Sequence, residues 1–147
     1  DPNNNLSLVR DGVERLLRSR LCASTPAQLG YLAGLQGQKD WMNSYTNKLL
    51  EQRDLCIKRI QSIDGLEVVK PNGAFYMFIR LTDGKWKTND KDFVLRLLEE
   101  EHVLVVHGSG FSSKYGQGYF RIVFLPSLKI LNEAFDRIEH FLIKHRK

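Results

Sequence analysis

The chain has 147 residues, of which 42% are hydrophobic and 27% charged, values that are ordinary for a globular domain with its own core. Its net charge is +5, but basic and acidic residues alternate along the chain, as in residues 135–147, and no nucleic-acid-binding motif accompanies them. No apolar run approaches the roughly 20 residues of a membrane span. We therefore expect neither a nucleic acid nor a membrane as partner, whereas an acidic small molecule suits the charge.

The sequence begins at Asp1 and opens like the middle of a longer chain, so we expect a piece of a larger protein. It shows no signal or transit pattern, which predicts a cytoplasmic location. Cys22 and Cys56 are too few for a secreted disulfide framework, and we expect both to be buried, reduced thiols.

Three helices are predicted in the first part of the chain. Residues 6–20 place apolar side chains on one face. Residues 25–35 begin with a threonine and a proline, which is a typical helix start. Residues 40–63 carry a long helical pattern that Gly65 ends.

The second part of the chain mixes strands and helices. Its predicted elements are a strand at 66–69, a turn at 71–73, a strand at 74–81, a polar loop at 82–89, a helix from Asp90 to 101, a strand at 103–106, a glycine-rich loop, a strand at 119–124 and a helix at 127–145. This order predicts an α/β (α+β) unit of two layers, with a small mixed or antiparallel sheet packed against helices.

The strand at 119–124 contains the first candidate site residue. Side chains alternate along a strand, so Phe120, Ile122 and Phe124 are expected to face the helices. Arg121 then points the other way. A buried arginine is costly without a partner, and its planar fork matches a carboxylate. A structural ion pair and a ligand carboxylate are both open explanations from this strand alone.

Motifs around Arg121 occur in an informative order. They are PNGAFYMF at 71–78, a strand leading into GSGF at 108–111, glycines at 116 and 118, and FRI at 120–122. This order resembles the C-terminal small domain of class I aminotransferases, which are fold-type-I enzymes that use pyridoxal 5'-phosphate (PLP). Upstream, residues 25–28 resemble the family's asparagine-threonine-proline turn. The resemblance covers nearly the whole chain and is greatest to the archaeal aspartate/alanine aminotransferase branch.

The resemblance implies a domain organisation and a set of site residues. Residues 1–25 would be a helix and loop from the end of the large domain, and residues 26–147 the small domain. Arg121 would bind the substrate α-carboxylate, and Phe75 would lie near the substrate. The loop bearing Arg20, Ser24 and Thr25 would approach the neighbouring subunit's active site in a homodimer. The family's substrates are an amino acid, here aspartate or alanine, and a 2-oxo acid such as 2-oxoglutarate.

The sequence departs from the family pattern at four positions. His107 and Ile79 stand where the family has prolines, Ser112 where it has a glycine, and Ser24 where it has an asparagine. The backbone of the glycine-rich loop is therefore expected to differ from the family's, whereas Arg121 itself is unaffected.

The family's PLP-binding lysine has no counterpart in the sequence. Lys114 resembles it superficially, but the signature needs an arginine eight residues later, and Arg121 follows after seven. We expect Lys114 to be an exposed loop lysine. The resemblance then implies that a separate large domain binds PLP, that this chain alone holds no cofactor, and that it has no catalytic residue or activity of its own.

Other sites are not predicted. The glycines form neither a dinucleotide fingerprint nor a P-loop, and the four histidines lack metal-binding spacing. Two alternative functions stay open: another fold-type-I PLP enzyme such as a lyase or synthase, and a non-catalytic α/β interaction module.

Overall fold

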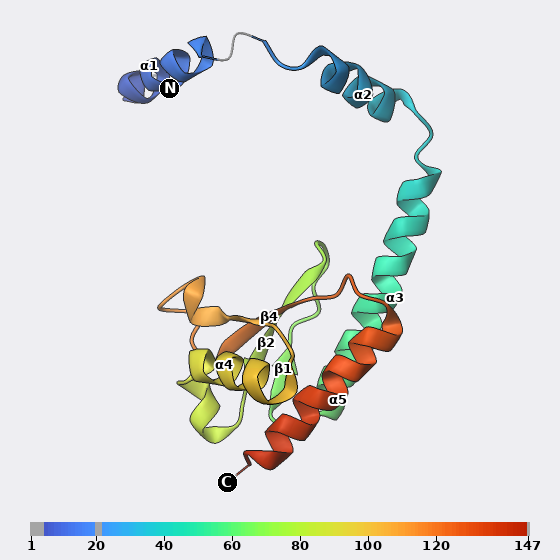
Figure 1. The fold of residues 1–147 in the computed structure, drawn as a ribbon, viewed down its shortest axis with the longest axis vertical. Helices are drawn as coiled ribbons and strands as arrows, with labels where there is room; N and C mark the ends of the chain where they lie inside the picture. The colour runs from blue at the N-terminus through green and yellow to red at the C-terminus, as the bar shows by residue number, and fades with distance from the viewer. Residues whose placement is uncertain (1–4, 20–21, 147) are drawn as a thin grey trace. The chain divides into compact units, whose positions relative to one another are not determined.

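The structure is a computed structural model that describes residues 5–19 and 22–146. They belong to two compact units, residues 1–41 and residues 42–147. Figure 1 shows the elements in chain order: α1 (Ser7–Arg18), α2 (Thr25–Gln36), α3 (Asp40–Ser62), β1 (Leu66–Val68), β2 (Tyr76–Leu81), the 3₁₀ helix η1 (Gly84–Lys87), α4 (Asp90–Glu101), β3 (Val106–His107), the 3₁₀ helix η2 (Gly108–Gly110), β4 (Tyr119–Val123) and α5 (Leu128–Lys144).

The first unit contains α1 and α2, and both helices form where the sequence predicts them. Thr25 begins α2 after Ser24 at the N-cap, and a proline occupies its first turn. Neither helix buries a side chain. Cys22, between the two helices, is exposed, and the prediction of a buried thiol at this position was wrong because none of the described residues of this unit packs over it.

The second unit is built on a four-stranded sheet with the order β1-β2-β4-β3, in which every pairing is antiparallel. Side chains from α3, α4 and α5 and from one face of the sheet form a single core. Figure 1 shows α4 and α5 lying against the sheet. The predicted two-layer α/β class, with a small antiparallel sheet packed against helices, is confirmed.

Aromatic residues dominate the core between the layers. Phe93 of α4 lies with its ring centroid 5.0 Å from that of Phe120 and 5.5 Å from that of Phe141. All three side chains are fully buried. Burying a phenylalanine contributes roughly 1.5–3 kcal/mol, so these rings are a main source of the unit's stability.

Two elements differ from the sequence prediction. The loop at 82–89 contains η1, because Trp86 folds inward and packs on Phe93 and Phe141 at 5.5 and 5.6 Å between ring centroids. The strand at 103–106 is reduced to β3, which pairs with β4 only through Val106 and His107. Residues 103–105 lead into it, with their valines in the core.

Candidate functional site

Arg121 lies on the face of the sheet opposite the helices. Phe120, Ile122 and Phe124 are buried in the core, as the alternation in β4 predicts. The register places Arg121 directly opposite Phe78 of β2 and Val106 of β3. Residues directly opposite one another in a sheet share a face. Arg121 therefore sits in the middle of an outward-facing, largely apolar surface.

Two aromatic rings flank the guanidinium of Arg121. Its Cζ lies 4.2 Å from the centroid of the Phe111 ring and 5.2 Å from that of Tyr76. Phe111 also makes an edge contact with Phe78, at 5.3 Å between centroids. Cation–π contacts hold a guanidinium in place without neutralising its charge. The side chain is thus oriented by rings rather than by an acid.

Arg121 has no acidic partner among the described residues, and its buried Nε has no hydrogen-bond partner there either. Every other described arginine of the second unit forms an ion pair, as Arg59 does with Asp136 at 2.7 Å and Arg96 with Glu100 at 2.8 Å. An unpaired, partly buried arginine is costly. It is therefore available to an anion from outside the unit, and the structural ion pair that the sequence left open is not formed within the described residues.

Two grooves lie beside Arg121. Arg121 itself lines one of about 700 Å³, together with Val106, Val123 and Leu125. Its neighbours Tyr76 and Phe78 line the other, of about 760 Å³.

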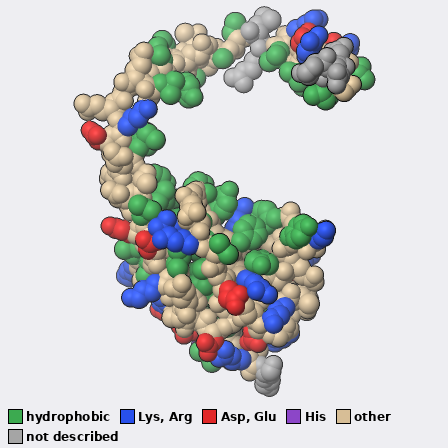
Figure 2. All heavy atoms as spheres, turned by 180° about the vertical axis from the view of Figure 1, so that it is seen from behind, with side chains coloured by type: hydrophobic (Ala, Val, Ile, Leu, Met, Phe, Trp, Pro, Cys, Tyr) green, Lys and Arg blue, Asp and Glu red, His purple; other side chains and the backbone are tan. Residues whose placement is uncertain are grey.

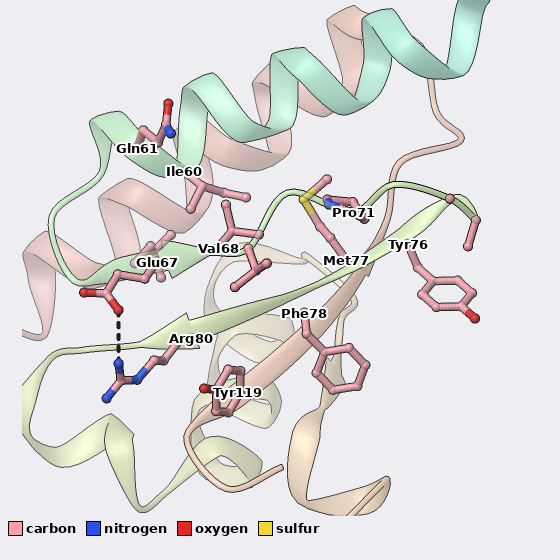
Figure 3. A pocket seen from close by; sticks show the side chains of 14 residues that line it. Ile60, Gln61, Glu67, Val68, Pro71, Tyr76, Met77, Phe78, Arg80 and Tyr119 are labelled. Carbon is pink, nitrogen blue, oxygen red and sulfur yellow. Dashed lines mark hydrogen bonds and ion pairs between the residues drawn. The ribbon is translucent and has the colours of Figure 1, made fainter. Parts of the chain in front are cut away.

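In Figure 3, Tyr76, Phe78 and Tyr119 project from one side of the strands that line the second groove, whereas Met77 points toward Ile60. Seen from behind in Figure 2, hydrophobic side chains gather over the upper part of the second unit. The groove that Arg121 lines is itself formed mostly by apolar residues.

The glycine-rich loop carries Phe111 to the guanidinium. A Cβ on Gly108 would lie 2.2 Å from the carbonyl oxygen of Gly116, so the two ends of the loop pack backbone to backbone. A Cβ on Gly110 would lie 2.9 Å from the His107 ring. Gly118 adopts a φ of +76°, which side chains other than glycine rarely tolerate. These glycines therefore serve a compact turn, as the sequence predicts.

Asp90, the first residue of α4, anchors this loop. Asp90 is only 3% exposed, and its Oδ2 accepts a hydrogen bond from the backbone N–H of Ser109 at 2.8 Å. Burial alone would raise the pKa of Asp90, but hydrogen bonds from the backbone and side chain of Ser109 and the backbone of Gly118 lower it below its ordinary value. The carboxylate is accordingly held in its charged form.

A second charged cluster lies between α4 and α5. Glu100 accepts hydrogen bonds from Lys144 at 2.8 Å, His145 at 2.8 Å and Arg96 at 2.8 Å. These donors, Lys144 foremost, lower the pKa of Glu100 to about 2. The cluster joins two helices and has a structural role.

The other predicted site residues are placed as follows. Phe75 precedes β2 and contacts the ring of Tyr76 at 5.6 Å, so Tyr76 rather than Phe75 is the aromatic residue of the GAFY segment that touches Arg121. Ser24 and Thr25 lie in the first unit, at the start of α2. Arg20 lies outside the described residues.

Sequence reasoning missed Tyr76 and Phe111 as neighbours of Arg121. Alternation from the core residue Met77 would have placed Tyr76 on the outer face. The contact between Phe111 and Arg121 depends on how the loop folds back onto the sheet, and no local pattern in the sequence indicates it.

The described residues offer no evident cofactor or metal site. They contain no cluster of three or more His, Cys, Asp or Glu side chains that could hold a metal ion. Lys114 is exposed, as predicted, and its Nζ lies 5.1 Å from the ring centroid of the adjacent Tyr115. In the part of the chain that is described, no helix combines the length and apolar character needed to cross a membrane.

Known proteins resemble the chain over almost its whole length. The glutamate-pyruvate aminotransferase AlaA of Haemophilus influenzae is 37% identical over 150 residues, which cover 99% of this chain and 37% of that protein. The aspartate aminotransferase of Rhizobium meliloti is 37% identical over 125 residues, which cover 80% of this chain and 30% of that protein. The alanine aminotransferase structure from Pyrococcus furiosus has a TM-score of 0.86 and 52% identity, and the match covers 99% of this chain and 36% of that one.

The chain therefore spans only about a third of the length of the relatives it matches. The archaeal structure supports the resemblance that the ordered motifs predicted. Residues 8–138 also match the family model for class I and II aminotransferases. The chain belongs to the class I and II aminotransferase family.

Proposed function

We propose that this chain is the substrate-carboxylate-binding part of a PLP-dependent aminotransferase, in which Arg121 binds the α-carboxylate of the amino acid. The observation that carries the proposal is the unpaired guanidinium of Arg121 between Phe111 and Tyr76. A carboxylate matches the guanidinium fork with two parallel hydrogen bonds. The apolar surroundings strengthen that pairing, because little water competes for it.

Holding the carboxylate also orients the reacting bond. A carboxylate fixed by Arg121 restricts rotation about the adjacent Cα, so the Cα–H bond is presented in one direction for proton removal. Amino acids and 2-oxo acids both carry this carboxylate, and one arginine therefore serves both halves of a transamination. The relatives named for glutamate-pyruvate, alanine and aspartate support alanine or aspartate as donor and a 2-oxo acid such as 2-oxoglutarate as acceptor.

PLP does not fit the described residues by themselves. In aminotransferases, PLP supplies the electron sink and is attached to a lysine. The sole lysine with a partial resemblance, Lys114, is exposed beside Tyr115 rather than enclosed. We assign the PLP lysine to the rest of the full-length enzyme, a homodimer, and expect residues 1–147 alone to be inactive. The domain boundary near residue 25, the roles of Phe75, Arg20 and Ser24, and the cytoplasmic location stay predictions.

Steady-state kinetics of the full-length enzyme test the role of Arg121. Arg121→Gln removes the charge while keeping some length. Loss of hydrogen bonds to a charged ligand should lower kcat/KM for L-alanine or L-aspartate about 10- to 100-fold. The matched control is Arg80→Gln, because Arg80 lies on the same sheet but already pairs with Glu67 at 3.2 Å.

The control should leave kcat/KM within about twofold of the parent value, as for a surface ion pair. Equal kcat/KM values for the parent and Arg121→Gln enzymes would rule out the proposed role.

A further inference from the structure

Asp90 is the single charged side chain that is buried among the described residues. A buried carboxylate is kept only where hydrogen bonds compensate for its lost hydration. A compensating hydrogen bond comes from the glycine-rich loop, because the backbone N–H of Ser109 donates to Asp90 at 2.8 Å. The carboxylate thus holds the loop near its beginning.

The anchored position lies close in sequence to the ring that stacks on Arg121, because Ser109 precedes Phe111 by two residues. The rest of the loop has little freedom, since Gly108 and Gly116 pack backbone to backbone. A shift of Ser109 would therefore change how the Phe111 ring lies over the Arg121 guanidinium, which it now meets at 4.2 Å.

His107 belongs to the same network. Its Nδ1 lies 3.0 Å from the Ser109 Oγ and 3.8 Å from the Asp90 Oδ2. In the tautomer that carries hydrogen on Nδ1, the His107 ring can donate to the Ser109 hydroxyl oxygen. His107 thereby adds a contact to the anchor.

We propose that Asp90 is a positioning residue of the carboxylate site, which fixes the stacking of Phe111 on Arg121 through Ser109. This inference rests on the proposed function of Arg121 but concerns a residue on another element. Asp90 touches no substrate in this account. It acts by holding Phe111 and Arg121 in register before a ligand arrives, which lowers the cost of ordering the site on binding.

NMR of the 147-residue chain without ligand tests the positioning directly. The ring current of Phe111 shifts the Cδ and Nε protons of Arg121 upfield when the ring stacks on the guanidinium. Phe111→Leu gives the unstacked reference positions of these resonances. We expect Asp90→Asn to move the Arg121 resonances most of the way toward that reference while the core amide resonances stay in place.

Asp92→Asn is the matched control, because Asp92 is an exposed acid in the same first turn of α4. It should leave the Arg121 resonances unchanged. In titrations with L-alanine, Asp90→Asn should weaken binding about two- to tenfold, the range expected for losing one preordered side chain. A folded Asp90→Asn chain with parental Arg121 resonances would overturn the inference.

Ser109→Ala covers the case in which Asp90→Asn does not fold. This variant keeps the backbone N–H bond to Asp90 and removes only the hydroxyl that Asp90 and His107 share. A smaller shift of the Arg121 resonances in the same direction supports the inference, and unchanged resonances refute it.

The Arg121 resonances of the ligand-free chain test only the positioning role of Asp90. Unaltered L-alanine binding by Arg121→Gln, in contrast, would refute the proposed function. The two failures are therefore distinguishable.

Discussion

The guanidinium carbon of Arg121 lies 4.2 Å from the centre of the Phe111 ring, which reaches it from a loop outside the sheet. This contact holds a cation in an apolar setting without supplying a counter-charge. The charge consequently remains available to a carboxylate, and the loop that delivers Phe111 becomes part of the site.

Phe111→Leu should weaken carboxylate binding more than it weakens the fold. The cation–π contact at a partly exposed site contributes about 0.5–1 kcal/mol, so urea unfolding should change by no more than that amount. Titration with L-alanine should show a several-fold loss of affinity, because Arg121 loses its ordering partner. Tyr115→Leu in the same loop is the control, since Tyr115 is 73% exposed, and it should bind like the parent. An equal loss of affinity for L-alanine in Phe111→Leu and Tyr115→Leu would contradict the role of Phe111.

Gly118→Ala should destabilise the second unit by about 2 kcal/mol or more. Its positive φ alone disfavours a side chain by roughly 1–2 kcal/mol, and the new Cβ would lie 2.5 Å from the carbonyl oxygen of Lys87. Gly84→Ala is the control because a Cβ there meets nothing within 4 Å, and its effect should stay within about 0.5 kcal/mol. Chemical denaturation measures both, and a Gly118→Ala chain as stable as the control would refute this reading of the turn.

Acid should weaken the junction of α4 and α5 through Glu100. Lys144, His145 and Arg96 lower its pKa to about 2 in the folded chain, from an ordinary value of 4.5. A depressed folded pKa means that the stabilising contribution is complete above pH 4.5 and is lost as the pH falls toward 2. The Tm of the parent should therefore drop over this window by more than that of Glu100→Gln.

Glu99→Gln serves as the control for this pH dependence, because Glu99 is an exposed neighbour on the same helix. It should keep the parent's loss of Tm between pH 4.5 and pH 2. A Glu100→Gln variant with the parent's pH profile would show that the cluster does not couple protonation to folding.

The two cysteines should differ sharply in reactivity. Burial raises the pKa of the Cys56 thiol to about 12, so it stays protonated and enclosed in α3. Cys22 is exposed. Because the thiolate is the reactive species, maleimide at pH 8 should label Cys22 alone in the folded chain and both residues in urea. Labelling of a folded Cys22→Ser chain would contradict the burial of Cys56.

Much of the fold follows from local patterns in the sequence. The alternation in residues 119–124 correctly predicts that Phe120 and Ile122 face the core and that Arg121 does not. α3 ends at Ser62, three residues before the predicted Gly65, and Gly65 lies in the following turn with a φ of +96°. These features depend on backbone geometry within a few residues, and a single sequence carries that information.

The rest depends on tertiary packing. No local pattern reveals that Trp86 turns a polar loop inward, or that Phe111 crosses to β4. Cys22 has apolar neighbours in the sequence, yet it is exposed, and neither α1 nor α2 buries a side chain. In the sequence, Asp90 looks like an ordinary acid at a helix start, and only the fold brings the backbone N–H of Ser109 to it.

The most direct test of the central claim is a titration of the chain with L-alanine and L-alaninamide, followed by the Nε–H resonance of Arg121. The two ligands differ in the carboxylate, which the amide lacks. We predict a saturable shift with L-alanine, no shift with L-alaninamide, and no response of the remaining arginine resonances. Equal shifts with both ligands, or a resonance that moves with neither, would contradict the assignment of Arg121 as the carboxylate-binding residue.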